Sequence, residues 1–131
     1  METRMSPLLT QTAELALDLL EKNKVLLVFC KAVQHDGHTV SIMPDAGGNL
    51  AEDSVRIELR RRAERREIKQ FTICSDVTAK FAGEPAPQRR LKIELQDGTA
   101  ESGIYYFPMQ FDQDCISLGK YAIADLVEKM I

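Results

Sequence analysis

The stretch NLAEDSVRIELRRRAERREIKQFTICSDVTAKF, residues 49–81, decides the fold, because a charged helix is followed directly by a long strand. Val55 and Leu59 lie four residues apart on one apolar stripe of an otherwise charged helix. After Ile68 apolar and polar residues alternate, which indicates a strand with one buried and one wetter face. We therefore expect a surface helix over Asn49–Glu67 that lies on a sheet.

The charges of this helix match its direction. Asn49 and Glu52 have the spacing of a capping box, at the positive end of the helix dipole. Arginines fill the last two turns, and Arg61 and Arg65 are the candidate contacts for a phosphate or an acidic partner. The helix holds six arginines against five acidic residues, so a solvated face matched to the dipole is the favoured interpretation.

The composition indicates one globular domain. The chain has 131 residues, of which 44% are hydrophobic and 28% are charged. The net charge of −3 argues against broad binding to nucleic acid or to anionic membranes, since a positive field drives both. The sequence has no apolar run long enough to span a bilayer and no basic-then-apolar leader. We expect a single domain over 1–131 in the cytoplasm, with residues 1–5 frayed.

The cysteines are odd in number and far apart, which favours free thiols over a disulfide framework. We interpret Cys30, Cys74 and Cys115 as buried thiols. A catalytic cysteine would need a base, and His35 and His38 are the two imidazoles of the sequence.

The first part of the chain predicts a helix and a hairpin. A Ser-Pro pair opens an amphipathic helix over Ser6–Asn23. The β-rich run that begins at Val25, the turn His35–Gly37 and the strand Thr39–Met43 have the layout of a hairpin. The alternative is a helix that continues to Ala32, which the β-branched residues and the Asp-Gly turn disfavour.

The second part of the chain predicts a meander and a last helix. Residues 91–96 alternate up to an Asp-Gly turn, and the next strand runs from Thr99 to about Gln110. A short strand follows at Cys115–Leu118, and apolar spacing predicts a helix over Gly119–Met130. Connections of hairpin length require antiparallel pairing. The expected fold class is α+β, an antiparallel sheet of four to six strands with the three helices packed mainly on one face.

Three short stretches carry a resemblance in layout. They are VLLVFCKAVQHDG (25–37), LKIELQDGTA (91–100) and YYFP (105–108). The order of helix, hairpin, charged helix and meander around them resembles a group of small bacterial α+β proteins of uncharacterised function. The resemblance implies the fold class and carries over no catalytic residue.

The string His35-Asp36-Gly37-His38 is the most site-like short motif. Two imidazoles and a carboxylate can hold zinc or nickel if a cysteine joins them. The sequence has neither a CxxC nor an HExxH pattern, and a hairpin turn is expected to be polar. We predict no metal and no cofactor.

Residues 104–111 differ from the other strands because both parities are apolar or aromatic until Gln110. One face of this strand can enter the core, and the other needs cover from a helix, a ligand or another subunit. Pro108 suits an edge strand. The residues expected at an interface are Tyr105, Tyr106, Phe107 and Met109. The alternative is a strand sandwiched between the sheet's own helices.

Three functions follow from these features. The favoured one is a non-catalytic interaction protein that forms a homodimer through the aromatic strand, with no membrane contact. The second is a small-molecule-binding domain or enzyme whose pocket between helix and sheet is lined by Cys74, Asp76, Tyr105 or Tyr106. Nucleic-acid binding through the arginine helix ranks third because of the acidic balance. The sequence contains no P-loop, GxSxG or Rossmann motif, which favours the first function.

Overall fold

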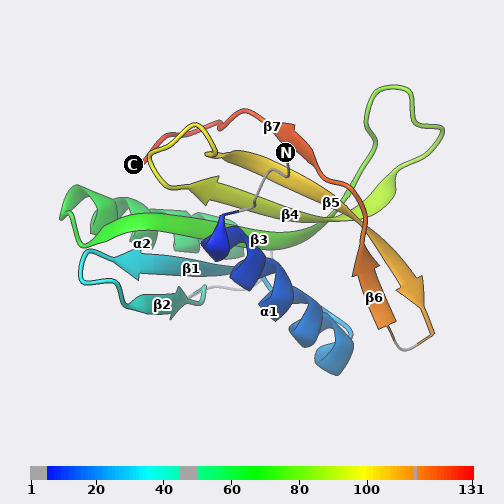
Figure 1. The fold of residues 1–131 in the computed structure, drawn as a ribbon, viewed down its shortest axis with the longest axis horizontal. Helices are drawn as coiled ribbons and strands as arrows, with labels where there is room; N and C mark the ends of the chain where they lie inside the picture. Colours follow the sequence, from blue (N-terminus) through cyan, green and yellow to red (C-terminus); the bar gives the residue numbers. More distant parts are fainter. Residues whose placement is uncertain (1–5, 45–49, 114) are drawn as a thin grey trace.

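The computed structural model describes residues 6–44, 50–113 and 115–131. Over these residues the chain forms an α+β fold with two helices and one antiparallel sheet of seven strands (Figure 1). The elements are α1 (Pro7–Asn23), β1 (Phe29–Gln34), β2 (Thr39–Ile42), α2 (Ala51–Glu64), β3 (Ile68–Ala79), β4 (Gln88–Gln96), β5 (Gly103–Asp112), β6 (Cys115–Leu118) and β7 (Ala122–Ala124).

The strands follow the order β2-β1-β3-β4-β5-β6, and β7 pairs with β5 beside β6. The hairpin prediction is confirmed, and the alternative of a longer first helix is wrong. Lys24 ends α1 in a left-handed conformation, with φ of 64° and its N–H bonded to the carbonyl of Leu20. The strand predicted at Cys115–Leu118 is also confirmed. The sheet has one strand more than the four to six expected.

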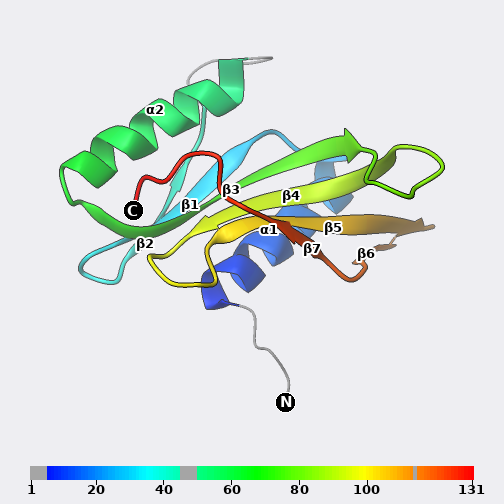
Figure 2. The same ribbon diagram turned by 90° about the horizontal axis from the view of Figure 1, so that it is seen from above.

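The two helices lie on opposite faces of the sheet, as Figure 2 shows. We call the face of the sheet covered by α1 the α1 face and the face covered by α2 the α2 face. The core on the α1 face contains Phe29, Cys74, Ile93, Tyr105 and Phe107. The α2 face is built on a second cluster that contains Cys30, Ala32, Val55, Leu59, Phe71 and Ile73. The expectation of helices mainly on one face is wrong because β1 and β3 carry buried residues on both parities.

Strand β3 shows this double burial directly. Thr72 and Cys74 stand on the parity expected to be wetter, yet both are fully buried on the α1 face. The hydroxyls of Thr12 in α1 and Thr72 lie 2.6 Å apart, and the Thr12 hydroxyl donates to the carbonyl of Leu8. A polar pair thus joins helix to sheet, and both hydroxyls have hydrogen-bond partners.

The helix predicted over Gly119–Met130 is wrong. Residues Ala122–Ala124 form β7, which pairs with Ile104–Tyr106 on the edge of β5 that β6 leaves open. The chain then runs without regular structure over residues 125–131, called the tail below, and returns on the α2 side of the sheet (Figure 2). Exposure in the tail alternates, since Leu126, Glu128 and Met130 are half-buried and the residues between them are exposed. The alternation shows that residues 126–130 lie with one side against the rest of the chain.

Helix α2 is shorter than predicted. It ends at Glu64, three residues before the expected end, because Arg66 adopts a left-handed conformation with φ of 57°. The predicted cap at Asn49, the predicted loop residues 45–48 and the residues 1–5, which were expected to be frayed, lie outside the described residues.

Candidate functional site

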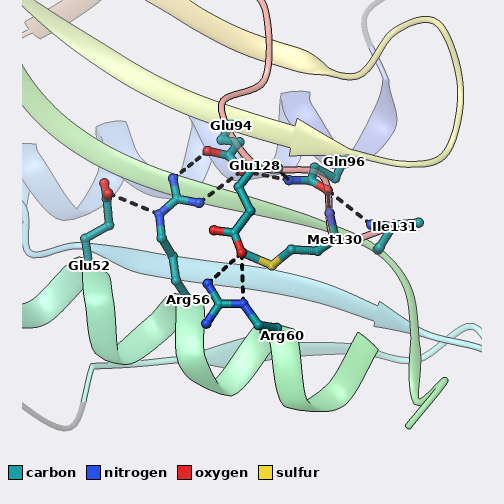
Figure 3. Close-up of polar contacts among 8 residues, drawn as sticks. All are labelled: Glu52, Arg56, Arg60, Glu94, Gln96, Glu128, Met130 and Ile131. Atoms are coloured by element: carbon teal, nitrogen blue, oxygen red, sulfur yellow. Dashed lines mark hydrogen bonds and ion pairs between the residues drawn. The ribbon is translucent and has the colours of Figure 1, made fainter. Parts of the chain in front are cut away.

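Polar side chains from α2 and β4 converge where the tail crosses them (Figure 3). Arg56 and Arg60 come from α2, and Glu94 and Gln96 come from β4. We call these four side chains, together with the apolar cluster on the α2 face, the tail-binding site. Glu94 and Gln96 stand on the parity of β4 that faces α2, whereas Leu91, Ile93 and Leu95 belong to the α1 face.

Gln96 is the centre of the site and is 1% exposed. Its Nε2 donates to the backbone carbonyl of Glu128 at 2.7 Å and to Oε2 of Glu94 at 2.9 Å. Its Oε1 accepts from the backbone N–H groups of Met130 at 2.8 Å and Ile131 at 3.2 Å. Both hydrogens and both lone pairs of the Gln96 side-chain amide are therefore used, and three of the four hydrogen bonds are made to the backbone of the tail.

Glu94 fixes the orientation of Gln96. Glu94 is 2% exposed and accepts two hydrogen bonds from the Arg56 guanidinium, at 2.6 and 3.3 Å. An ionised carboxylate can only accept, so it holds the donor nitrogen of Gln96 toward itself and leaves Oε1 toward the tail. Arg56 also donates to Glu52 at 3.2 Å. Burial alone would lower the pKa of Arg56, but the hydrogen bonds and charge of Glu94 raise it above its usual value.

Arg60 contacts the side chain of the tail. Its Nε and NH2 groups donate to Oε1 of Glu128 at 2.8 and 2.5 Å. The two side chains are 45% and 36% exposed, so the pair contributes about 0–1 kcal/mol. Met130 and Ile131 pack against the apolar cluster of the α2 face. The tail is thus held by backbone, charge and apolar contacts together.

The residues expected at an interface lie elsewhere. Tyr105, Phe107 and Met109 are buried on the α1 face and belong to its core. Tyr106 is half-buried on the other face, with its ring 5.1 Å from that of Phe81. The edge of β5 that faces away from β4 is paired with β7 and β6. Three of the four side chains are therefore occupied within the chain, as in the alternative of a sandwiched strand.

The candidate anion contacts lie outside the tail-binding site. Arg61 donates to Glu58 at 2.5 and 2.7 Å, and Arg65 is exposed at the end of α2. Hydrogen bonds from Arg61 and Arg62 lower the pKa of Glu58. Sequence reasoning selected the terminal arginines of α2, whereas Arg56 and Arg60 are the ones that reach β4 and the tail.

The thiols and histidines do not converge on one another. Cys30 and Cys74 are buried, and burial raises the pKa of each thiol. Cys115 is exposed, so the interpretation of this thiol as buried is wrong. Nδ1 of His38 lies 3.0 Å from Asp36 on the exposed turn. Within the described ranges, no group of three or more His, Cys, Asp or Glu side chains has the arrangement of a metal site.

The residues expected to line a pocket are used in packing and pairing. Cys74 and Tyr105 are core residues, and Asp76 pairs with Arg89. Two surface pockets lie elsewhere. One, of about 230 Å³, is lined by Leu20, Glu21, Lys24, Arg89, Phe111, Gln113, Cys115 and Ile116. The other, of about 250 Å³, is lined by Leu19, Asn23, Val25, Leu26, Leu27 and Met43.

Comparison with known proteins gives no relative for this chain. It matches no protein-family model, no curated protein and no solved structure. In the part of the chain that the structure describes, no helix is both long and apolar enough to cross a membrane.

Proposed function

We propose that the protein is a non-catalytic interaction domain that holds a short peptide segment at the tail-binding site. In this proposal the tail is the resident occupant, and a segment of a partner protein displaces it. The observation that carries the proposal is the buried amide of Gln96, which donates to one backbone carbonyl of the tail and accepts from two backbone N–H groups.

The contacts of Gln96 suit recognition in trans because three of its four hydrogen bonds go to backbone groups, which any segment in the same backbone conformation presents. Backbone hydrogen bonds give a peptide site its affinity, and side-chain contacts give its specificity. Without an occupant the Gln96 amide would bond to water in place of the three backbone groups, so each of these bonds contributes about 0.5–1.5 kcal/mol net. The site therefore favours the occupied state, whichever segment occupies it.

The tail is held loosely enough to exchange. All of β7 is exposed, and Val127 in the tail is 92% exposed. Segments with few buried apolar contacts open locally at a lower free energy than the whole fold. Local opening of the tail is the step that admits a partner segment.

Self-association belongs to the same proposal. A chain that binds its own tail can bind the identical tail of a second copy, as in domain swapping. The homodimer predicted from the sequence would then form through exchange of tails and not through the aromatic strand.

A peptide in trans tests the proposal. The full-length Glu128→Arg chain places like charges at Arg60 and position 128, which loosens the tail without touching Gln96. A fluorescently labelled peptide of residues 121–131 should bind this chain with a saturable rise in anisotropy. The native chain should bind the peptide more weakly, because its own tail competes at an effective concentration on the order of millimolar.

The matched control is Lys129→Glu, which also changes a charge of the tail but at a side chain that is exposed. It should bind the peptide as weakly as the native chain does. A folded Glu128→Arg chain that binds no peptide would show that the tail is a fixed part of the fold and would remove the proposal.

A second candidate function rests on the pocket of about 250 Å³ beside β2. Val25, Leu27 and Met43 line it and are 62%, 69% and 56% exposed. An apolar small molecule would cover them. The volume lies below the range of about 300–1,000 Å³ typical of ligand sites, so this function ranks second. Binding of an apolar dye that Leu27→Asp abolishes would favour it.

A further inference from the structure

We infer that the tail-binding site selects segments in which an acidic residue is followed by any residue and then by two apolar residues. The inference rests on the proposed function and names the chemistry of the partner. The tail supplies the pattern, with Glu128, Lys129, Met130 and Ile131 in the four positions. Each position meets a different part of the site.

Gln96 sets the register of the segment. Its Nε2 binds the carbonyl of the first position, and its Oε1 binds the N–H groups of the third and fourth positions. Glu94, held by Arg56, prevents the amide from turning over, because the oxygen of a turned amide would face the carboxylate. A segment shifted by one residue would present its side chains to the wrong partners.

Arg60 reads the first position. Its Nε and one terminal nitrogen both donate to the same oxygen, Oε1, of the Glu128 carboxylate, and both are charge-assisted hydrogen bonds. Arg56 lies one turn earlier on α2, with its guanidinium committed to Glu94 and Glu52. A lysine or arginine at the first position would meet the like charge of Arg60, so the site rejects basic segments as well as attracting acidic ones.

The side chain at the second position does not contribute to recognition, whereas the side chains at the third and fourth positions are recognised through burial. Lys129 is exposed, whereas its two neighbours in the tail are half-buried. Met130 and Ile131 pack on the cluster that contains Val55, Leu59 and Phe71. A charge at the third or fourth position would have to be desolvated against these apolar side chains, which is unfavourable without a partner.

A charge-swap matrix tests the inference. The receptors are two full-length chains, Glu128→Arg and Arg60→Glu, in which like charges loosen the tail to a similar degree. The ligands are labelled peptides of residues 121–131, one native and one carrying Glu128→Arg. The first receptor should prefer the native peptide and the second the substituted peptide, each by about five- to tenfold at low salt, and high salt should reduce both preferences.

Two further peptides report the other positions. A peptide with Met130→Asp should lose binding to both receptors, and a peptide with Lys129→Asp should bind the first receptor as the native peptide does. Circular dichroism and a single unfolding transition establish that each receptor is folded. If Arg60→Glu does not fold, the milder Arg60→Gln takes its place and should show no preference between the first two peptides.

The outcomes separate the inference from the proposed function. Binding of both charge variants with equal affinity to both receptors would overturn the selectivity and leave peptide binding intact. Absence of binding in every combination of folded receptor and peptide would overturn the proposed function and the inference together. Loss of all binding when Gln96→Leu is added to the first receptor would support the register that both share.

Discussion

At the scale of single residues, the site depends on two polar side chains whose burial the alternation of β4 does not reveal. Glu94 and Gln96 alternate with the apolar Ile93 and Leu95, and this pattern alone predicts that the polar parity faces water. Helix α2 and the tail cover that parity, so Glu94 and Gln96 are buried. The sequence of β4 does not predict that α2 and the tail cover these two residues. Helix α2 was expected on the same face as α1, and the tail was expected to be helical.

The Arg56–Glu94 pair should behave as a coupled unit. Arg56→Met alone leaves the Glu94 carboxylate buried without its cation and should lower the free energy of unfolding by about 3 kcal/mol or more. Glu94→Leu should cost less, since Arg56 keeps Glu52 as a partner. The double variant should cost clearly less than the sum of the two, as measured by urea unfolding. Strict additivity would mean that the pair does not hold the site together.

The thiols should differ in reactivity. Cys115 is exposed, whereas Cys30 and Cys74 are buried with raised pKa values that disfavour the reactive thiolate. At mildly alkaline pH, an aromatic disulfide reagent should therefore titrate one thiol in the native protein and all three in denaturant. Rapid reaction of three thiols without denaturant would contradict the packing of both core clusters.

At the scale of elements, the strands follow from local signals and the last helix does not. Alternation and the two Asp-Gly turns locate the β1–β2 hairpin and the β4–β5 pair, since turn chemistry and a period of two are properties of short stretches. The spacing of apolar residues over 119–131 is as compatible with a helix as with a strand. Pairing with the open part of the β5 edge decides in favour of β7, and such pairing depends on a partner distant in sequence.

The pairing of β7 with β5 should determine how often the tail opens. A Cβ atom added at Gly103 would lie 3.0 Å from the side chain of Ile123 and 3.1 Å from the carbonyl oxygen of Ala124. The side chain can rotate away, but the carbonyl belongs to the backbone, so β7 must move. Gly103→Ala should therefore speed amide hydrogen exchange over residues 122–131 and leave α1 unchanged.

Gly119→Ala is the matched control for this variant. Its added Cβ atom would lie 3.4 Å from the nearest atom of Pro108, which needs little adjustment. Exchange in the tail should stay at the native rate. Equal exchange rates in the two variants would show that the position of β7 does not govern the hold on the tail.

At the scale of the whole molecule, the sequence predicts the class of fold but not the distribution of its core. An α+β chain with an antiparallel sheet follows from the order of elements, whereas the placement of α1 and α2 on opposite faces follows from residues buried on both parities of β1 and β3. The aromatic strand illustrates the difference. It does carry more apolar surface than one sheet face needs, but α1 and Tyr121 cover that surface within the chain.

The homodimer is predicted to form by exchange of tails. The native chain should show a dimer in analytical ultracentrifugation that grows as the chain concentration approaches the effective concentration of its own tail, on the order of millimolar. The chains Arg60→Glu and Glu128→Arg should each be monomeric, and their equimolar mixture should form a heterodimer, because the acidic site of the first accepts the basic tail of the second. Replacing the second chain by Lys129→Glu should weaken the heterodimer, because only one of the two exchanged contacts then joins opposite charges. A mixture of the Arg60→Glu and Glu128→Arg chains that sediments as two monomers would contradict tail exchange.

Displacement of the tail by a peptide can be observed directly by nuclear magnetic resonance. Unlabelled peptide of residues 121–131 is titrated into ¹⁵N-labelled native chain while the amide signals of Met130 and Ile131 and the side-chain amide of Gln96 are followed. The account predicts that the Met130 and Ile131 signals move to the positions of a free segment, while the Gln96 amide keeps its bound position because the peptide has replaced the tail. Tail signals that stay unchanged at saturating peptide would contradict the account.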